Sequence, residues 1–92
     1  MADQTAKVTM YRTEYCPFCV AAARMLDGLG VTYETVSLDD HPDRHGVTSA
    51  ILPGHYTVPL VVIDGRPIGG YQELAALHAD NELGPMLFGG AA

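Results

Sequence analysis

The chain has 92 residues, a length that allows one domain, so we expect residues 1–92 to form a single domain. Its net charge is −6, and its few basic residues are scattered, which argues against a nucleic-acid partner because such a partner needs a basic patch. The N-terminal segment has no signal-peptide pattern, and no stretch approaches the ~18 apolar residues of a membrane span. We therefore expect a cytoplasmic protein with no membrane contact.

The first half of the chain predicts a strand, a helix and a second strand. Apolar and polar residues alternate over residues 7–12 and again over 32–38, a pattern typical of strands. Residues 17–29 between them have helical periodicity, with Pro17 suited to the first turn and Gly30 to the end. The apolar face of this helix is formed by Phe18, Ala22, Met25, Leu26 and Leu29.

The middle of the chain predicts a short helix and then a buried strand. We expect the helix over residues 42–51, with Asp40 as its N-cap. Gly46 weakens the helical pattern. Residues 60–63 form a continuous apolar run, as in a strand that is buried on both faces.

A hairpin and a further helix follow. Asp64 and Gly65 favour a tight turn, so residues 66–68 form the returning strand. Pro67 places that strand at a sheet edge, because proline cannot donate to a second neighbour. Two glycines then precede a helix over residues 71–79.

These elements predict an α/β fold with the order βαβαββα. The expected packing is one four-stranded mixed β-sheet flanked by helices on both faces, the minimal thioredoxin fold. Gly84 and Pro85 start a last helical turn. Residues 1–6 and 89–92 are predicted to be loose ends.

A C-x-x-C motif, Cys16 and Cys19, stands between the first predicted strand and the first predicted helix. Free N–H groups and the positive end of the dipole at a helix start stabilise a thiolate, which is the reactive form of cysteine. One helical turn brings the second sulfur close to the first. The motif therefore predicts a redox pair in which Cys16 attacks a disulfide and Cys19 resolves the mixed disulfide that forms.

Two further elements accompany this motif. Thr57, Val58 and Pro59 directly precede the buried strand, where a proline requires a bend in the chain. Gly69 and Gly70 precede the last long helix, and the N–H groups at such a helix start form an anion site.

The three elements together resemble those of a dithiol glutaredoxin, from about Val8 to Leu87. The resemblance implies a cis bond before Pro59 and a monomeric thiol–disulfide oxidoreductase without a permanent cofactor. It also implies glutathione as reducing co-substrate, protein disulfides and protein–glutathione mixed disulfides as substrates, electron transfer to reductive enzymes, and an indirect link to glutathione reductase. Besides catalytic Cys16 and Cys19, the implied glutathione contacts are Tyr15, Pro17, Phe18, His55, Thr57, Val58, Pro59, Gly70, Tyr71, Gln72 and Glu73.

Two positions depart from the family pattern. Thr13 stands where the family usually has a lysine, and His55-Tyr56 stands where a basic or amide residue usually precedes the Thr-Val-Pro element. Those groups normally hold the glycine carboxylate of glutathione. Arg12 and His55 are the candidates to replace them.

Two alternatives remain open at the level of sequence. One is a glutaredoxin-like carrier that thioredoxin reductase reduces. The other is a zinc- or iron–sulfur-binding module, because His41 and His45 follow the two cysteines. The 21 residues between Cys19 and His41 exceed the spacing of a zinc finger, and Pro17 stiffens the site against a cluster, so we expect no metal site.

Overall fold

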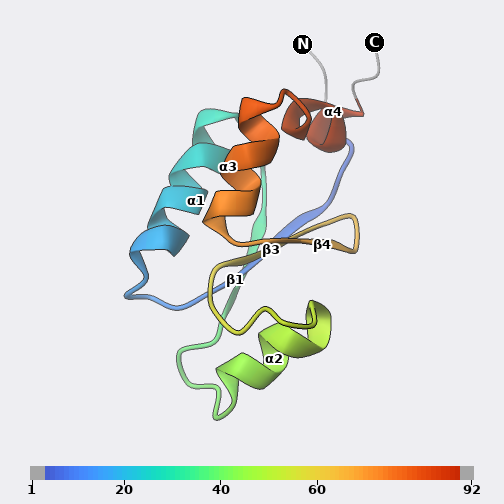
Figure 1. Cartoon of the computed structure of the whole chain (residues 1–92). Helices are drawn as coiled ribbons and strands as arrows, with labels where there is room; N and C mark the ends of the chain where they lie inside the picture. Colours follow the sequence, from blue (N-terminus) through green and yellow to red (C-terminus); the bar gives the residue numbers. More distant parts are fainter. Residues whose placement is uncertain (1–3, 90–92) are drawn as a thin grey trace.

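The structure, a computed structural model, describes residues 4–89 (Figure 1). Its elements in chain order are β1 (Val8–Arg12), α1 (Pro17–Gly28), β2 (Glu34–Ser37), α2 (Arg44–Ile51), β3 (Leu60–Ile63), β4 (Arg66–Gly69), α3 (Tyr71–Ala79) and α4 (Leu83–Phe88). Each predicted strand and helix is present, and the bounds differ from the predicted ones by two residues or fewer.

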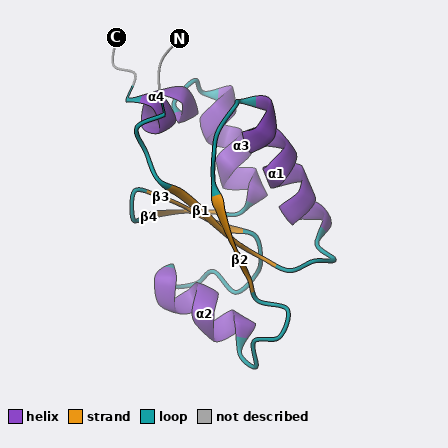
Figure 2. Ribbon diagram, turned by 180° about the vertical axis from the view of Figure 1, so that it is seen from behind, coloured by secondary structure: helices purple, strands orange, loops and turns teal. Residues whose placement is uncertain are grey.

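The four strands form one mixed sheet in the order β2-β1-β3-β4. β1 pairs with β2 in parallel and with β3 antiparallel, and β3 pairs antiparallel with β4. Helices α1 and α3 lie side by side on one face, whereas α2 lies on the other (Figures 1 and 2). The predicted four-stranded sheet with helices on both faces is confirmed. Buried side chains that fill the core include Val8, Met10, Ala22, Leu26, Val61, Ile63 and Leu74.

The β3–β4 hairpin follows its turn residues. Asp64 and Gly65 both have positive φ angles, 51° and 77°, which a type I′ turn requires. The Asp64 carboxylate also accepts a hydrogen bond from the Lys7 N–H at 2.8 Å, so the turn is tied to the start of β1. Pro67 lies on β4, which is an edge strand as predicted.

The N-terminal segment is more ordered than predicted. The N–H groups of Thr5 and Ala6 donate to the Leu87 carbonyl, and Ala6 is 5% exposed. The Gln4 side chain bonds both backbone groups of Thr32. The prediction of a loose end was wrong for residues 4–6, because these contacts with α4 and the β2 side have no local sequence signal. Residues 1–3 and 90–92 of the predicted loose ends lie outside the described residues.

Helix α2 begins with a different cap from the predicted one. Asp43, not Asp40, accepts a hydrogen bond from the Gly46 N–H at 3.0 Å. This spacing is that of an N-cap and the third helical residue. A Cβ at Gly46 would overlap the Asp43 carboxylate, so glycine here supports the cap rather than weakening the helix.

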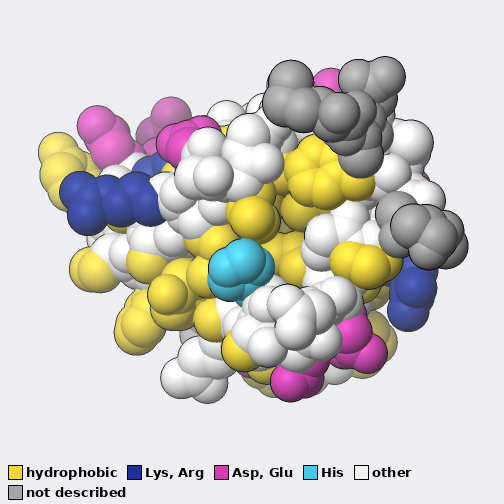
Figure 3. Space-filling model, turned by 90° about the horizontal axis from the view of Figure 1, so that it is seen from above, with side chains coloured by type: hydrophobic (Ala, Val, Ile, Leu, Met, Phe, Trp, Pro, Cys, Tyr) yellow, Lys and Arg dark blue, Asp and Glu magenta, His cyan; other side chains and the backbone are white. Residues whose placement is uncertain are grey.

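Helices within residues 4–89 are too short or too polar to cross a membrane. Figure 3 views the molecule from the end that carries α4. On this face the lysine and arginine side chains of the described residues stand at opposite edges, and apolar side chains lie between them.

The change Asp43→Ala should lower the free energy of unfolding by about 1 kcal/mol, because it removes the side-chain acceptor of an N-cap. Asp40→Ala is the matched control, since it removes the same charge three residues earlier without removing a cap. Urea unfolding measures both. Equal destabilisation by the two changes would contradict the assignment of Asp43 as the cap.

Candidate active site

Cys16 is the N-cap of α1. Its extended backbone (φ −127°, ψ 105°) turns the Sγ atom toward the first turn of the helix, where it accepts a hydrogen bond from the Cys19 N–H at 3.2 Å. A cysteine at this position interacts with the positive end of the helix dipole as well. Both interactions direct partial positive charge at the sulfur, so the local geometry suits Cys16 to act as a nucleophile.

The loop that carries Cys16 is anchored on the end of β2. The N–H of Glu14 donates to both carboxylate oxygens of Asp39, at 2.9 and 3.1 Å. This backbone donor, followed by the Ser37 hydroxyl, holds the pKa of Asp39 below its usual range. The anchor links two sequence-distant loops and fixes the approach of the chain to the helix start.

Cys19 differs from Cys16 in exposure and in its protonation. Cys19 is 0% exposed, whereas Cys16 exposes 9% of its surface. Burial, and then the hydrogen bond with the Cys16 side chain, raise the pKa of Cys19 to about 12. Cys19 therefore stays a thiol at neutral pH. The predicted roles require this difference, because Cys16 must react with the incoming disulfide and Cys19 must react only after the mixed disulfide has formed.

The loop before β3 lies against the exposed side of Cys16. The Val58–Pro59 peptide bond is cis, as the family resemblance implied. The Val58 carbonyl accepts a hydrogen bond from the Cys16 thiol at 3.6 Å. Backbone groups of this loop are therefore in place beside any disulfide that reaches Cys16.

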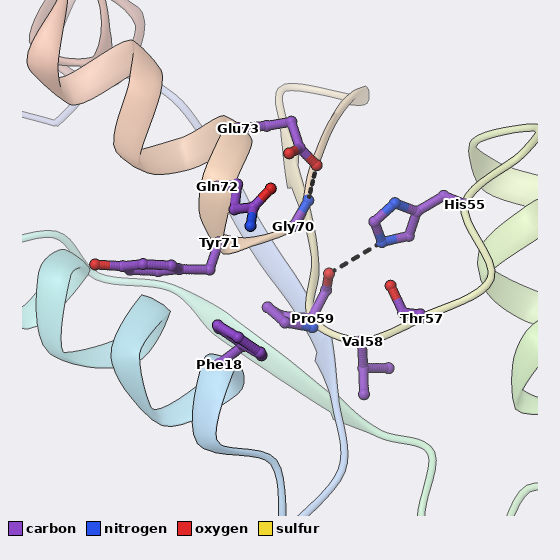
Figure 4. A pocket seen from close by; sticks show the side chains of 9 residues that line it. All are labelled: Phe18, His55, Thr57, Val58, Pro59, Gly70, Tyr71, Gln72 and Glu73. Carbon is purple, nitrogen blue, oxygen red and sulfur yellow. Dashed lines mark hydrogen bonds between the residues drawn. The ribbon is translucent and has the colours of Figure 1, made fainter.

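A cavity of about 350 Å³, which we call the α3 pocket, opens next to this loop (Figure 4). Its lining residues are Phe18, His55, Thr57, Val58, Pro59, Gly70, Tyr71, Gln72 and Glu73, all of them predicted ligand contacts. At the edge of the pocket, the ring centroids of Phe18 and Tyr71 lie 6.3 Å apart, and this pair of rings bridges α1 and α3. The prediction that Phe18 belongs to the core face of α1 was wrong, because it is 57% exposed beside the pocket.

The start of α3 closes one end of the α3 pocket. The Glu73 carboxylate accepts a hydrogen bond from the Gly70 N–H at 2.8 Å, so this side chain caps its own helix. Gly69 has a φ of 126°, and a Cβ there would lie 2.6 Å from that carboxylate. The following N–H groups, of Tyr71 and Gln72, belong to the first turn, where backbone donors have no acceptor within the helix.

The His55 ring lies beside the start of α3, because a Cβ at Gly70 would be 3.6 Å from its Cε1 atom. Its Nε2 is 3.1 Å from the Pro59 carbonyl (Figure 4). Since a carbonyl only accepts, Nε2 carries a proton. Arg12 does not line the pocket, and its Nε donates to the Thr13 carbonyl instead. Of the residues that line the pocket, His55 alone can become a cation.

A second cavity, of about 380 Å³, lies on the other side of the Val58 loop, and we call it the α2 groove. Its lining residues are Thr13, Tyr15, Cys16, Pro17, Arg44, His45, Tyr56, Thr57 and Val58. The structure thus places Tyr15 and Pro17 here and not in the α3 pocket. Sequence reasoning missed Arg44 and Tyr56, because no local pattern shows that α2 packs beside Cys16.

The metal-binding alternative rests on the two cysteines together with His41 and His45. Within residues 4–89, no three His, Cys, Asp or Glu side chains gather where they could hold one metal ion. His41 accepts a hydrogen bond from the Asp43 N–H at 3.0 Å, which is a local loop contact. His45 lines the α2 groove.

Three features of this site together define the class of protein. They are a nucleophilic cysteine at the start of a helix, a buried cysteine one turn later and a cis-proline loop beside the two. The protein is a thiol–disulfide oxidoreductase of the thioredoxin fold. Comparison with known proteins narrows this class. The glutaredoxin family profile matches residues 8–68, and the chain belongs to the glutaredoxin family.

Individual relatives agree with this assignment. The chain is 38% identical over 85 residues to glutaredoxin-C6 of rice, which covers 90% of this chain and 76% of the rice protein. The wheat glutaredoxin structure superimposes with a TM-score of 0.80 at 33% identity, over 96% of this chain and 83% of that one. A buckwheat glutaredoxin–glutathione complex gives a TM-score of 0.79 at 34% identity, over 89% and 76% of the two chains.

The raised pKa of Cys19 predicts a loss of stability at high pH. Below pH 9 this thiol is protonated in both states, so it contributes no pH dependence. Between pH 9 and about 12 the unfolded chain ionises Cys19 while the folded protein keeps its proton, so the free energy of unfolding falls as pH rises. Urea unfolding of the reduced protein should show this fall, by at most ~1.4 kcal/mol per pH unit.

The matched control is Cys19→Ser, which has nearly the same shape but no titration in this range. The free energy of unfolding of this variant should fall less over the same pH interval, because only the other titrating groups contribute. Identical pH profiles for the two proteins would show that burial does not hold the Cys19 proton.

Proposed function

We propose that the protein is a glutathione-dependent reductase of protein disulfides and protein–glutathione mixed disulfides that carries electrons to reductive enzymes. The observation that carries this proposal is that Val58, whose carbonyl contacts the Cys16 sulfur, also lines a pocket that ends at the N-terminus of α3. A buckwheat relative is known as a glutathione complex, which supports the choice of ligand. The proposal includes a monomer in the cytoplasm, where glutathione keeps thiols reduced.

In this proposal, glutathione extends through the α3 pocket. Its cysteinyl backbone pairs with the backbone of Val58 in the manner of an added strand. Its γ-glutamyl carboxylate binds the N–H groups of Tyr71 and Gln72 at the start of α3. Its glycine carboxylate then lies toward His55, the cation-capable residue of the lining.

Removal of glutathione from a protein needs Cys16 alone. The Cys16 thiolate attacks the glutathionyl sulfur, a Cys16–glutathione disulfide forms, and the protein sulfur leaves as a thiolate that takes up a proton. A second glutathione, as thiolate, attacks the glutathionyl sulfur of that disulfide, which releases oxidised glutathione and restores Cys16. Glutathione reductase recycles the oxidised glutathione and is thus an indirect partner.

Reduction of a protein disulfide needs both cysteines. Cys16 attacks one sulfur of the disulfide, and the other sulfur leaves as a thiolate that takes up a proton. Cys19, which is a thiol at neutral pH, gives up its proton as it attacks Cys16, and the second substrate sulfur leaves as a thiol. The two electrons come from the cysteine pair, which ends as a disulfide that two glutathione molecules reduce.

One observation favours the alternative in which thioredoxin reductase supplies the electrons. The α3 pocket has no lysine or arginine in its lining, so its hold on the glycine carboxylate depends on His55. Turnover with glutathione and glutathione reductase, compared with turnover with thioredoxin reductase, decides between the two. An absorption spectrum with metal analysis of the purified protein tests the zinc or iron–sulfur alternative.

Cys16→Ser should abolish all reductase activity, because it removes the attacking sulfur. Cys19→Ser should retain removal of glutathione from proteins but lose most reduction of intramolecular protein disulfides, since release of those substrates needs the second sulfur. Steady-state assays with a glutathionylated peptide and with a disulfide protein measure the two activities. Full protein-disulfide activity in Cys19→Ser would refute the division of roles.

His55→Ala should weaken glutathione binding by about threefold to tenfold, the size of a charge-assisted hydrogen bond at a half-exposed site. The loss would come from removal of the cation-capable side chain of the pocket lining. Calorimetry with S-methylglutathione, which cannot react with Cys16, measures the affinity.

Two variants serve as controls for this measurement. His55→Lys supplies a positive charge at the same position and should bind at least as tightly as the parent. His78→Ala removes an exposed histidine near the end of α3, outside the α3 pocket, and should bind like the parent. An unchanged affinity in His55→Ala would place the glycine carboxylate elsewhere.

A further inference from the structure

The turn at Glu14 and Tyr15, which leads from β1 to Cys16, has little packing of its own. Tyr15 is 91% exposed and Glu14 is exposed as well, although α1 begins directly after Cys16. A segment with few buried contacts opens easily, so its backbone position depends on hydrogen bonds from neighbouring elements. The position of the Cys16 sulfur therefore depends on how this turn is held.

The Asp39 carboxylate holds the turn from outside. Both of its oxygens accept the Glu14 N–H, at 2.9 and 3.1 Å, two residues before Cys16. This backbone donor, followed by the Ser37 hydroxyl, lowers the pKa of Asp39, so the carboxylate is ionised at neutral pH. A hydrogen bond to an ionised acceptor is roughly twice as strong as one between neutral groups.

The sheet in turn fixes Asp39. Ser37, the last residue of β2, donates its hydroxyl to the Asp39 Oδ2 atom at 2.8 Å. Leu38, between the two, is 3% exposed, and its N–H donates to the Arg12 carbonyl at 2.8 Å. Arg12 ends β1 and lies opposite Ser37 in the parallel β1–β2 pair. The pairing of these strands therefore positions the carboxylate that holds the turn.

The other charged groups around Asp39 have different contacts. Arg44 and Arg12 are positive charges that lower the pKa of Asp39 further, after its two hydrogen bonds. Asp43 and His41 line one cavity with Asp39, but the Asp43 carboxylate caps α2 and the His41 ring accepts the Asp43 N–H. The hydrogen bond to the turn therefore belongs to Asp39.

We propose that Asp39 is a positioning residue for the sulfur exchange, because its hold on the Glu14 N–H keeps the Cys16 sulfur at the start of α1. This inference rests on the proposed role of Cys16 as the attacking sulfur. The sulfur is 3.2 Å from the Cys19 nitrogen and 3.6 Å from the Val58 oxygen. A shift of the turn by about 1 Å would disturb these contacts, and misplacement of that size slows a reaction.

The test measures the reaction of pre-reduced protein with the 2-thiopyridyl disulfide of N-acetylcysteine amide. Cys16 attacks the cysteinyl sulfur, a mixed disulfide with Cys16 forms, and 2-thiopyridine leaves and takes up a proton, which changes the absorbance. The second-order rate of this single step needs neither glutathione nor a reductase. Asp39→Ala removes the acceptor, whereas Asp39→Asn removes the charge but keeps an oxygen that accepts.

Asp39→Ala should react about threefold to tenfold more slowly than the parent, the range expected for loss of one hydrogen bond. Asp39→Asn should react at a rate close to that of the parent, because its amide oxygen still accepts the Glu14 N–H. Asp40→Ala is the matched control, since it removes the same charge one residue later. It should react at least as fast as the parent, because loss of a negative charge favours a thiolate.

The amide proton of Cys19 separates positioning from a general loss of stability, because its chemical shift reports the geometry of the folded state. Cys19 donates to the Cys16 sulfur and has no contact with Asp39 in this hydrogen-bond network. In the reduced protein its amide proton should move upfield in Asp39→Ala, as its hydrogen bond weakens. It should keep its position in Asp40→Ala. Urea unfolding establishes that each variant is folded under the conditions of the assay.

An unchanged rate or an unchanged Cys19 amide shift in Asp39→Ala would overturn the positioning role of Asp39. A rate in Asp39→Asn as low as that in Asp39→Ala would overturn it too, because the charge and not the acceptor would then matter. These outcomes leave the proposed function intact. Failure of the proposed function has a different signature, in which Cys16 reacts in the single step but glutathione does not regenerate the protein.

Discussion

The hydrogen bond from the Cys19 N–H to the Cys16 sulfur joins the fold to its chemistry. The same bond that caps α1 also holds the sulfur at the positive end of the helix. It depends on the helix being in place, and the helix is held by side chains such as Ala22 and Leu26, which are fully buried against the sheet. The packing of the core therefore controls where the nucleophile lies.

The difference between the two sulfurs follows from one helical turn. Cys16 lies just before the helix, at the surface, whereas Cys19 lies within the first turn and faces the core. Burial keeps Cys19 protonated, and so it does not compete for an incoming disulfide. Burial is the main cause of the raised pKa of Cys19, and the Cys16 side chain adds to it. A mixed disulfide on Cys16 removes this second contribution, so it makes the resolving sulfur more acidic.

Much of the fold and part of the site were predictable because their signals are local. Asp64 and Gly65 specify a turn by their own backbone preferences, and the Cys16–Cys19 spacing on a helix start gives the redox pair directly. The predictions were wrong at positions where tertiary contacts determine the local structure. Phe18 has the spacing of a core residue, but it lies where α1 emerges beside the α3 pocket. Asp40 and Asp43 are both possible caps by composition, and only the path of the loop selects between them.

The α2 groove was beyond sequence reasoning for the same reason. Arg44 lies on α2 and Tyr56 precedes β3, and only the folded chain brings them beside Cys16. The charge of Arg44 is offset at close range, because Asp39 and Asp43 line a neighbouring cavity together with it. After the backbone and hydroxyl donors of Asp39, the Arg44 charge also lowers the pKa of that carboxyl. The electrostatics of the groove therefore depend on the path of the loop between β2 and α2, which is set by tertiary contacts.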